Sequence, residues 1–335
     1  MSGRKRVVIT MEQGEVFDDI FQPDLMRELE READVVLNDL GRPLTTEELA
    51  QRARDADAII TAWRTPRVDR SVTDAAPRLR MIAHAAGSVK NLYDPSLWDT
   101  GIVITNAASV MADYVGEFAL LATLTMLRTL PKYAWGVSEG SWDGIRSDGW
   151  ETLIGKTVGL IGLGNTARAF LRFLAPFECR VIAYDPYAGC ERANELNVEL
   201  VSLDEVLSVS KVISVHAPIT DETTGMLGAR ELSLIPDGAV LVNTARGILI
   251  DHNALAKELG TGRFKAALDV TYPEPLPADH PLRKLPNVLL TPHVAGPTRD
   301  GRREMFRCVL DDLKLFWSGG TPKNVVTREM LATMA

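Results

Sequence analysis

The sequence predicts an α/β fold made of two domains, each built on a parallel β-sheet. Short runs of β-branched residues alternate with amphipathic helical patterns along the whole chain, which is typical of parallel α/β architectures. These runs fall into two separate series, and 335 residues are enough for two domains of ordinary size. In the second series the strands are almost continuously apolar, as expected where helices cover both faces of a sheet.

The first series of strands is expected in the amino-terminal third of the chain, at residues 6–10, 33–38, 58–62, 79–84 and 102–105. Amphipathic patterns at residues 23–32 and 45–54 predict helices between these strands. Thr45, at the start of the second pattern, is followed three residues later by Glu48, the spacing of a capping box. This part of the chain contains no glycine-rich phosphate loop.

The second series follows a polar stretch rich in glycine and tryptophan, residues 136–150, which is expected to form a loop or an arm. Its strands are expected at residues 156–161, 180–184, 212–216, 239–243, 266–269 and 288–291. Open parallel sheets bind ligands at the carboxyl ends of their strands. The residues that follow these strands are therefore the candidates for function.

The charge balance argues against polyanionic partners. The chain has 37 basic and 45 acidic residues and a net charge of -8, which opposes attraction to nucleic acid or an anionic membrane. The most apolar helical stretch, residues 118–127, is about half as long as a bilayer-spanning helix. We expect it to be a buried or interface helix.

The cysteines and the amino terminus indicate a cytoplasmic protein. Cys179, Cys190 and Cys308 are scattered and show no CxxC spacing, which fits a reducing compartment and predicts neither disulfides nor a structural zinc site. The basic amino terminus is followed by too short an apolar run for a signal peptide.

A dinucleotide site is predicted after the strand at residues 156–161. The sequence Gly162-Leu163-Gly164-Asn165-Thr166-Ala167 opens a helical pattern, in which Gly162 would allow a tight turn and Gly164 a close approach to a pyrophosphate. The alternative is an ordinary strand-to-helix connection.

Asp185 ends the next strand roughly 20 residues on, where an acid can bind the adenosine ribose hydroxyls. It would repel a 2′-phosphate, so NAD is preferred to NADP; its alternative role is that of a turn residue before proline.

Among the histidines, His293 is the candidate for proton transfer. It ends a strand, and Arg246 and Glu274 follow two other strands and could be its partners. Taken singly, Arg246 could form an ordinary ion pair and Glu274 could be an exposed acid between two prolines. The other histidines are expected to be structural: His84, His216, His252 and His280. The segment His216-Ala217-Pro218 is also expected to border the cofactor.

Six motifs in this order resemble the D-isomer-specific 2-hydroxyacid dehydrogenases over roughly residues 80–300: GLIGLGNTA, AYDPY, HAPIT, VNTARG, DVTYPEP and TPHVAG. The resemblance implies two Rossmann-like or flavodoxin-like domains with parallel sheets and a cleft between them. Residues 1–105 and 299–335 would form a discontinuous substrate domain, and residues 106–298 the NAD-binding Rossmann domain.

The resemblance also implies catalytic roles. Arg246 would bind the substrate carboxylate and polarise the keto oxygen, and His293 would exchange a proton with that oxygen. Glu274 would pair with His293, orient its ring and favour the imidazolium form. No metal is required for this arrangement.

Further residues are implied to contact the cofactor or the substrate. Asp269 would bind the nicotinamide carboxamide, although it could instead cap a loop. The other residues implied to contact the cofactor are Asn165 and Thr166 through backbone donors, Thr244 and Ala245 along the nicotinamide ring, and Gly296. The loop Ala86-Gly87-Ser88 would bind the substrate carboxylate through backbone amides, together with Arg246 and His293; the alternative for this loop is a routine turn.

The chain departs from the family pattern at three places. Asn165-Thr166 replaces Arg-Ile in the phosphate turn, which removes a cation that Arg168 could partly replace. Tyr114 is larger than the usual residue near the active site, and Lys90 stands near a position where the family usually has an acid.

We therefore expect an NAD-dependent oxidoreductase that interconverts a small 2-keto acid and a D-2-hydroxy acid. A formate- or phosphite-type dehydrogenase and an NADH-sensing regulatory protein on the same fold are the alternatives. Trp135, Trp142 and Trp150 lie where relatives place a dimerisation arm, so a homodimer is expected, unless these side chains pack against their own domain.

Overall fold

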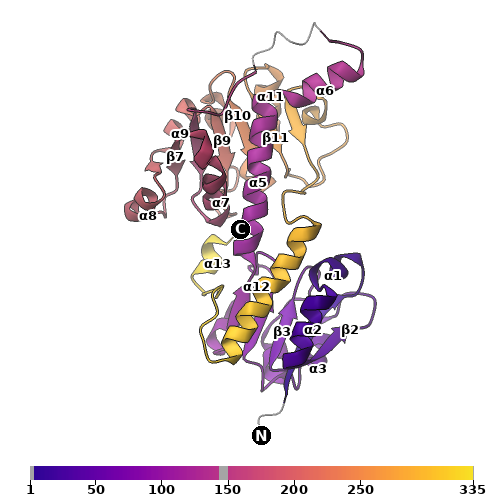
Figure 1. Cartoon of the computed structure of the whole chain (residues 1–335). Helices are drawn as coiled ribbons and strands as arrows, with labels where there is room; N and C mark the ends of the chain where they lie inside the picture. The colour runs from indigo at the N-terminus through magenta and orange to yellow at the C-terminus, as the bar shows by residue number, and fades with distance from the viewer. Residues whose placement is uncertain (1–3, 143–149, 335) are drawn as a thin grey trace. The chain divides into compact units, whose positions relative to one another are not determined.

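The computed structural model describes residues 4–142 and 150–334, which form two compact units (Figure 1). One unit comprises the residues up to Met111 together with Pro297–Met334, and the other comprises Ala112–Gly296. The sequence placed the boundaries after residue 105 and before residue 299. The chain divides later at the first boundary because Val110 and Met111 pack against the core of the first unit.

The first unit is built on a five-stranded sheet with the order β2-β1-β3-β4-β5, in which every ladder is parallel. Successive residues of a strand pack into two separate cores, because side chains alternate between the faces of a sheet. Val7 and Ile9 of β1 pack with α1, α2 and α12, whereas Val8 packs on the opposite face with α3 and α4. The strands are β1 (Lys5–Glu12), β2 (Ala33–Asn38), β3 (Ala58–Thr61), β4 (Met81–His84) and β5 (Val103–Asn106).

The helices of the first unit lie on both faces of its sheet. The predicted capping box at the start of α3 is present, because the side chain of Thr45 accepts from the Glu48 amide and that of Glu48 accepts from the Thr45 amide. The helices are α1 (Glu15–Ile20), α2 (Pro23–Glu32), α3 (Thr46–Arg52), α4 (Arg70–Ala75), η1 (Pro95–Asp99), α12 (Arg299–Trp317) and α13 (Met330–Thr333).

The second unit is built on a seven-stranded sheet with the order β12-β11-β10-β9-β6-β7-β8, and its ladders are also all parallel. The strands are β6 (Thr157–Ile161), β7 (Arg180–Tyr184), β8 (Glu199–Leu200), β9 (Val212–Val215), β10 (Val240–Asn243), β11 (Lys265–Leu268) and β12 (Val288–Leu290). Every strand expected from the sequence is present, with ends within two residues, and the two-residue strand β8 was not foreseen. The predicted α/β fold with two parallel sheets is confirmed.

Helices cover both faces of the second sheet. Residues of α5 and α7 share one core with β6 and β10, and residues of α9, α10 and α11 share the other. The helices are α5 (Ala108–Leu127), α6 (Leu130–Ser138), α7 (Asn165–Leu174), η2 (Ala175–Phe177), α8 (Cys190–Glu195), α9 (Leu203–Val209), α10 (Ala229–Ser233), η3 (Gly247–Leu249), α11 (His252–Gly260) and η4 (Pro281–Lys284).

The apolar helix α5 is longer than the sequence predicted. It has 20 residues and, by length and composition alone, could cross a membrane, so the expectation that it is too short was wrong. Its small residues nevertheless pack in the core of the second unit. A Cβ added at Gly116 would lie 2.8 Å from the backbone nitrogen of Phe170 in α7, which shows how closely the two helices approach.

The stretch expected to be a loop or an arm begins as a helix. Helix α6 extends through Ser138 and therefore includes the first residues of the 136–150 stretch. Trp135, Trp142 and Trp150 are all exposed, and Trp150 makes an edge contact with the ring of Tyr133. Residues 143–149 of the predicted arm lie outside the described residues.

Candidate active site

Three adjacent strands of the second sheet bring the predicted catalytic residues to one edge. Strands β10, β11 and β12 are neighbours, and the segments that follow them carry Arg246, Glu274 and His293. Because the strands are parallel, all three segments leave the same edge of the sheet.

His293 and Glu274 form a direct hydrogen-bonded pair. The Nδ1 atom of His293 lies 2.7 Å from Oε1 of Glu274, and the two side chains are 49% and 43% exposed. An ionised carboxylate can only accept hydrogen bonds, so Nδ1 carries the proton between them. The Nε2 atom is then the ring nitrogen that can exchange a proton with a ligand.

Asp269 fixes the loop that carries His293. Its carboxylate accepts hydrogen bonds from the Thr291 hydroxyl at 2.6 Å, from the Val294 amide at 2.9 Å and from the Ala295 amide at 2.8 Å. Its backbone oxygen accepts from the His293 amide at 2.9 Å. These bonds hold His293 in the left-handed region, with φ 57°, a conformation that costs about 1–3 kcal/mol for such a residue. Asp269 therefore has the loop-capping role that was its alternative, and its contact with the carboxamide stays a prediction.

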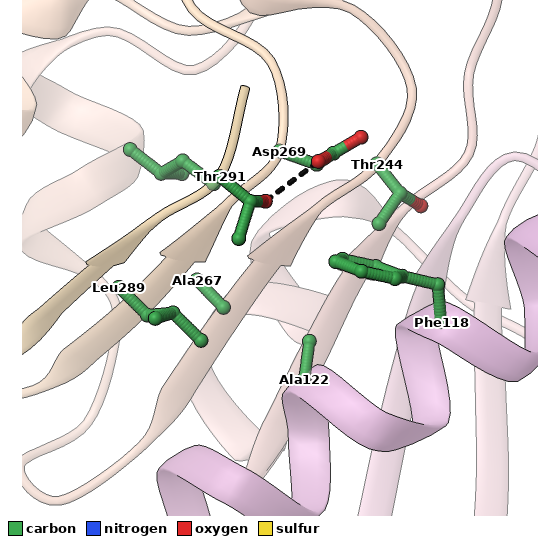
Figure 2. A pocket seen from close by; sticks show the side chains of 8 residues that line it. Phe118, Ala122, Thr244, Ala267, Asp269, Leu289 and Thr291 are labelled. Atoms are coloured by element: carbon green, nitrogen blue, oxygen red, sulfur yellow. Dashed lines mark hydrogen bonds between the residues drawn. The ribbon is translucent and has the colours of Figure 1, made fainter. Parts of the chain in front are cut away.

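A small hollow lies beneath Asp269, between α5 and the strands (Figure 2). Phe118 and Ala122 line it from α5, and Ala267 and Leu289 line it from β11 and β12. Thr244, which follows β10, also lines it, and its buried hydroxyl has no hydrogen-bond partner within the described part of the chain. A buried hydroxyl without a partner costs about 1–3 kcal/mol, and the hollow beside it is too small to admit a water molecule.

The Arg246 loop is held by its neighbours on both sides. The Asn243 side chain accepts from the Ala245 amide and donates to the Arg246 carbonyl, both at 3.0 Å. A Cβ added at Gly247 would lie 2.1 Å from the carbonyl of Thr271, so only glycine lets this loop contact the segment that leads to Glu274. Sequence reasoning did not assign roles to Asn243 and Gly247, although both belong to the motif that contains Arg246.

Burial and charge act in opposite directions on Arg246. Burial lowers the pKa of its guanidinium, and the negative charge of Glu274 opposes this shift. Arginine nevertheless stays protonated in proteins, so a half-buried positive charge lies near the His293–Glu274 pair. A positive charge in this position can bind a carboxylate or polarise a carbonyl oxygen.

The glycine-rich turn after β6 has the geometry predicted from the sequence. Gly162 has a φ of 91°, and a Cβ there would lie 2.8 Å from the Ala217 amide nitrogen. A Cβ at Gly164 would meet nothing within 4 Å, and Gly164 is the N-cap of the ten-residue helix α7. The open space before the backbone amides of Asn165 and Thr166 therefore fits a pyrophosphate group.

Asp185 connects the end of β7 to this turn. One carboxylate oxygen accepts from the Leu163 amide at 2.7 Å, and the other accepts from the amides of Tyr187 and Ala188 at 2.9 and 3.1 Å. Asp185 thus has the turn role that was its alternative. Its partly exposed carboxylate stands at the same strand edge as Gly164, and its contact with a ribose stays a prediction.

His216 lies in the interior of the second unit. Its Nε2 atom is 2.9 Å from the Ser214 hydroxyl, and its ring centroid is 5.6 Å from that of Phe170. The segment His216-Ala217-Pro218 is predicted to border the cofactor. Its contact with the glycine-rich turn is made by the backbone at Ala217, next to Pro218, and not by the His216 ring. His84 is also buried, with Nδ1 2.8 Å from the Thr61 hydroxyl, as its structural interpretation predicted.

The predicted substrate loop belongs to the first unit, where it follows β4. The Gly87 carbonyl accepts from the Asn106 side chain at 2.8 Å, and the Ala86 carbonyl accepts from the Ala107 amide at 2.9 Å. These bonds fix the loop from one side. The roles of Ala86, Gly87 and Ser88 toward a substrate, and of Gly296 toward a cofactor, stay predictions.

The comparisons with known proteins agree with this geometry. Residues 120–295 match the family described as D-isomer specific 2-hydroxyacid dehydrogenase, NAD binding domain. A glyoxylate reductase of Aeropyrum pernix is 35% identical over 98% of this chain and 97% of its own. The chain belongs to the D-isomer specific 2-hydroxyacid dehydrogenase family. The family and the NAD-dependent dehydrogenase class predicted from the six motifs are therefore confirmed.

Two further relatives of this dehydrogenase differ in length and in how closely they match. A D-3-phosphoglycerate dehydrogenase of Archaeoglobus fulgidus is 36% identical over 84% of this chain, but the match covers only 54% of that longer protein. The crystal structure of a phosphoglycerate oxidoreductase from Rhizobium etli superposes with a TM-score of 0.82 at 27% identity, over 96% of this chain and 98% of that one.

The burial of His216 predicts a pH-dependent stability. Burial lowers its pKa to about 3, whereas the unfolded chain binds a proton near pH 6.5. The contribution of neutral His216 to stability is therefore complete above about pH 6.5 and is lost as the pH falls toward 3. Urea unfolding should show a free energy of unfolding about 2 kcal/mol lower at pH 5 than at pH 8 from this residue alone. In His216→Gln that difference should shrink correspondingly; an unchanged difference would contradict the assignment.

Proposed function

We propose that this dehydrogenase interconverts a small 2-keto acid and a D-2-hydroxy acid, with His293 and Glu274 as the acid–base pair and Arg246 as the substrate anchor. The observation that carries the proposal is the 2.7 Å bond between His293 Nδ1 and Glu274 Oε1, which leaves Nε2 to exchange a proton. The nearby half-buried guanidinium of Arg246 supplies the charge that a 2-keto carboxylate requires.

In the direction of reduction, Arg246 binds the substrate carboxylate and donates a hydrogen bond to the keto oxygen. NADH held at the cofactor site would supply the hydride that reduces the keto carbon. His293 donates its Nε2 proton to the oxygen that becomes the hydroxyl, so one proton and one hydride are consumed for each keto acid reduced. Glu274 keeps the ring oriented through Nδ1 and balances the positive charge of the imidazolium. Oxidation of the hydroxy acid uses the same groups in reverse.

The residues that would hold NAD lie at the same edge of the second sheet. The amides of Asn165 and Thr166 at the start of α7 would bind the pyrophosphate, and Asp185 would bind the ribose hydroxyls. Toward the other end of the cofactor, Thr244 would lie along the nicotinamide ring and the Asp269 carboxylate would bind the carboxamide. The negative charge of Asp185 favours NAD over NADP.

The relatives named glyoxylate reductase and D-3-phosphoglycerate dehydrogenase support a substrate with a carboxylate next to a carbonyl or hydroxyl group. The loop Ala86–Ser88 would bind that carboxylate as well. A formate- or phosphite-type activity, or NADH sensing without turnover, is a different outcome of the same assays. We also propose a cytoplasmic location, since the scattered cysteines fit a reducing compartment.

Replacing the proton donor should slow turnover strongly but preserve cofactor binding. His293→Ala should lower kcat for keto acid reduction by about 10²- to 10⁴-fold, because no other group delivers the proton. Glu274→Gln should lower kcat less, because glutamine still accepts a hydrogen bond but carries no charge. NADH absorbance with a panel of 2-keto acids measures both, and His280→Ala in the turn before η4 is the control. Wild-type turnover in His293→Ala would exclude His293 as the donor, and absence of any keto acid reduction in a wild-type chain that binds NADH would exclude the proposed reaction.

Removing the charge of Asp185 should weaken the preference for NAD. Asp185→Asn keeps an oxygen that can accept from the turn amides, but it no longer repels a 2′-phosphate. The ratio of the NADPH and NADH dissociation constants, measured by fluorescence titration, should fall by about tenfold. If the ratio stays at its wild-type value, Asp185 serves the turn alone.

We further propose that the chain forms a homodimer through the stretch from residue 121 to residue 154. Large apolar side chains are exposed along it, and Trp135 is 71% exposed. Apolar surface of this kind is typical of a protein interface. Among the described residues of this stretch, the exposed large apolar ones are Leu121, Leu130, Trp135, Val137, Trp142, Trp150 and Ile154.

A charge placed in this surface should separate the subunits. Trp135→Glu should convert the dimer to a monomer in sedimentation velocity, because an interface cannot bury an unpaired carboxylate without a large cost. Val209→Glu, at an exposed apolar residue of α9, should leave the dimer intact. A monomeric wild-type chain, or a Trp135→Glu variant that still dimerises, would count against this surface.

A further inference from the structure

The glycine-rich turn lies between two other strand-end loops. In the second sheet β6 is flanked by β9 on one side and by β7 on the other. Neighbouring strands are about 4.8 Å apart, so the loops that follow β7 and β9 stand roughly 10 Å apart on either side of the turn. Any contact between these two loops must therefore bridge the carboxyl end of β6.

Such a contact exists between Tyr187 and Glu222. The Tyr187 hydroxyl donates to Oε2 of Glu222 at 2.6 Å, although the tyrosine is 66% exposed and the glutamate is also exposed. The bond to Glu222 raises the pKa of the Tyr187 phenol, so the hydroxyl stays protonated and can donate. The Tyr187 ring is exposed, and within the described residues its hydroxyl bonds only to another loop. Packing alone does not explain this arrangement.

Both ends of this bond are held by ordered turns. Asp185 accepts from the Tyr187 amide, which fixes the backbone of that residue beside the proposed ribose site. On the other side, Thr220 and Thr223 exchange hydrogen bonds, and the Thr223 hydroxyl donates to the Pro218 carbonyl at 2.7 Å. These bonds order the turn that contains Glu222. The two side chains are therefore presented to each other by preformed loops.

We propose that Tyr187 and Glu222 form a latch across the glycine-rich turn, which retains the adenosine half of NAD(H) and adds a second carboxylate that disfavours a 2′-phosphate. This inference rests on the proposed cofactor site, because Asp185 places the adenosine ribose between the two loops. The latch must open to admit or release the dinucleotide. Its hydrogen bond therefore sets the dissociation rate of NADH and takes no part in the chemical step.

The charge of Glu222 acts separately from its hydrogen bond. Asp185 follows β7 and Glu222 lies on the loop that follows β9, on the two sides of β6, and a 2′-phosphate between them would meet two negative charges. Glutamine at residue 222 would still accept a bond from Tyr187 but would remove one of these charges. This substitution therefore separates retention of the adenosine from discrimination against NADPH.

The test is a double-mutant cycle on the full chain, with NADH release as the readout. Stopped-flow fluorescence measures the dissociation rate of NADH from the wild type and from Tyr187→Phe, Glu222→Ala and the double variant, without any substrate. Each single variant should release NADH about tenfold faster, and the double variant should be no faster than the singles, because all three lack the same bond. Glu191→Ala, at an exposed acid in the first turn of α8, controls for loss of surface charge and should release NADH at the wild-type rate.

A second measurement separates the two parts of the proposal. Glu222→Gln should release NADH within about twofold of the wild-type rate but bind NADPH several-fold more tightly than the wild type does. Wild-type release rates in Tyr187→Phe and Glu222→Ala, or effects that add in the double variant, would overturn the latch and leave the cofactor proposal intact. A wild-type chain that binds neither NADH nor NADPH would overturn both.

Discussion

The proposed chemistry depends on one buried carboxylate, that of Asp269. It accepts hydrogen bonds from the Thr291 hydroxyl and from the amides of Val294 and Ala295, and the same residue accepts from the His293 amide through its backbone. The loop is thereby closed around Asp269, and His293 is held in a left-handed conformation that its sequence does not favour. In this arrangement the imidazole presents Nδ1 to Glu274 and leaves Nε2 available.

The parallel sheet brings motifs that are separate in the sequence to one edge. The segments after β10, β11 and β12 carry Arg246, Glu274 and His293, and those after β6, β7 and β9 form the glycine-rich turn and its flanking loops. Two glycines allow the loops at this edge to approach each other: Gly162 lies against the backbone of Ala217, and Gly247 lies against the backbone of Thr271. A side chain at either position would push apart loops that the site requires to be close.

Much of the fold could be predicted because buried parallel strands are continuous apolar runs, which stand out in the sequence. The two-residue strand β8 is too short to give such a signal. The length of α5 was underestimated because Asp113, Gly116 and Glu117 interrupt the apolar pattern in its first half. Gly116 is nevertheless required there by the contact with α7, a reason that only the packing shows.

The candidate site could be predicted where the residue types of a motif indicate their chemical role. It could be predicted less well where two loops distant in the sequence meet. The residue types of Arg246, Glu274 and His293 already suggested their roles, and the structure shows the His293–Glu274 bond. The capping role of Asp269 was foreseen only as an alternative, because its partners lie on the next strand and loop. The bond between Tyr187 and Glu222 joins the AYDPY motif to a residue just beyond the HAPIT motif, and no spacing within either motif indicates it.

The most direct test of the proposed reaction is the fate of an isotopic label. The chain is incubated with NADH that carries deuterium at the transferable position of C4 and with a 2-keto acid of three or more carbons, and the product is analysed by mass spectrometry and chiral chromatography. Hydride transfer with protonation by His293 predicts a D-2-hydroxy acid that carries the deuterium on C2 and a hydroxyl proton from solvent. An L product, or a reduced product without deuterium at C2, would contradict the proposed reaction.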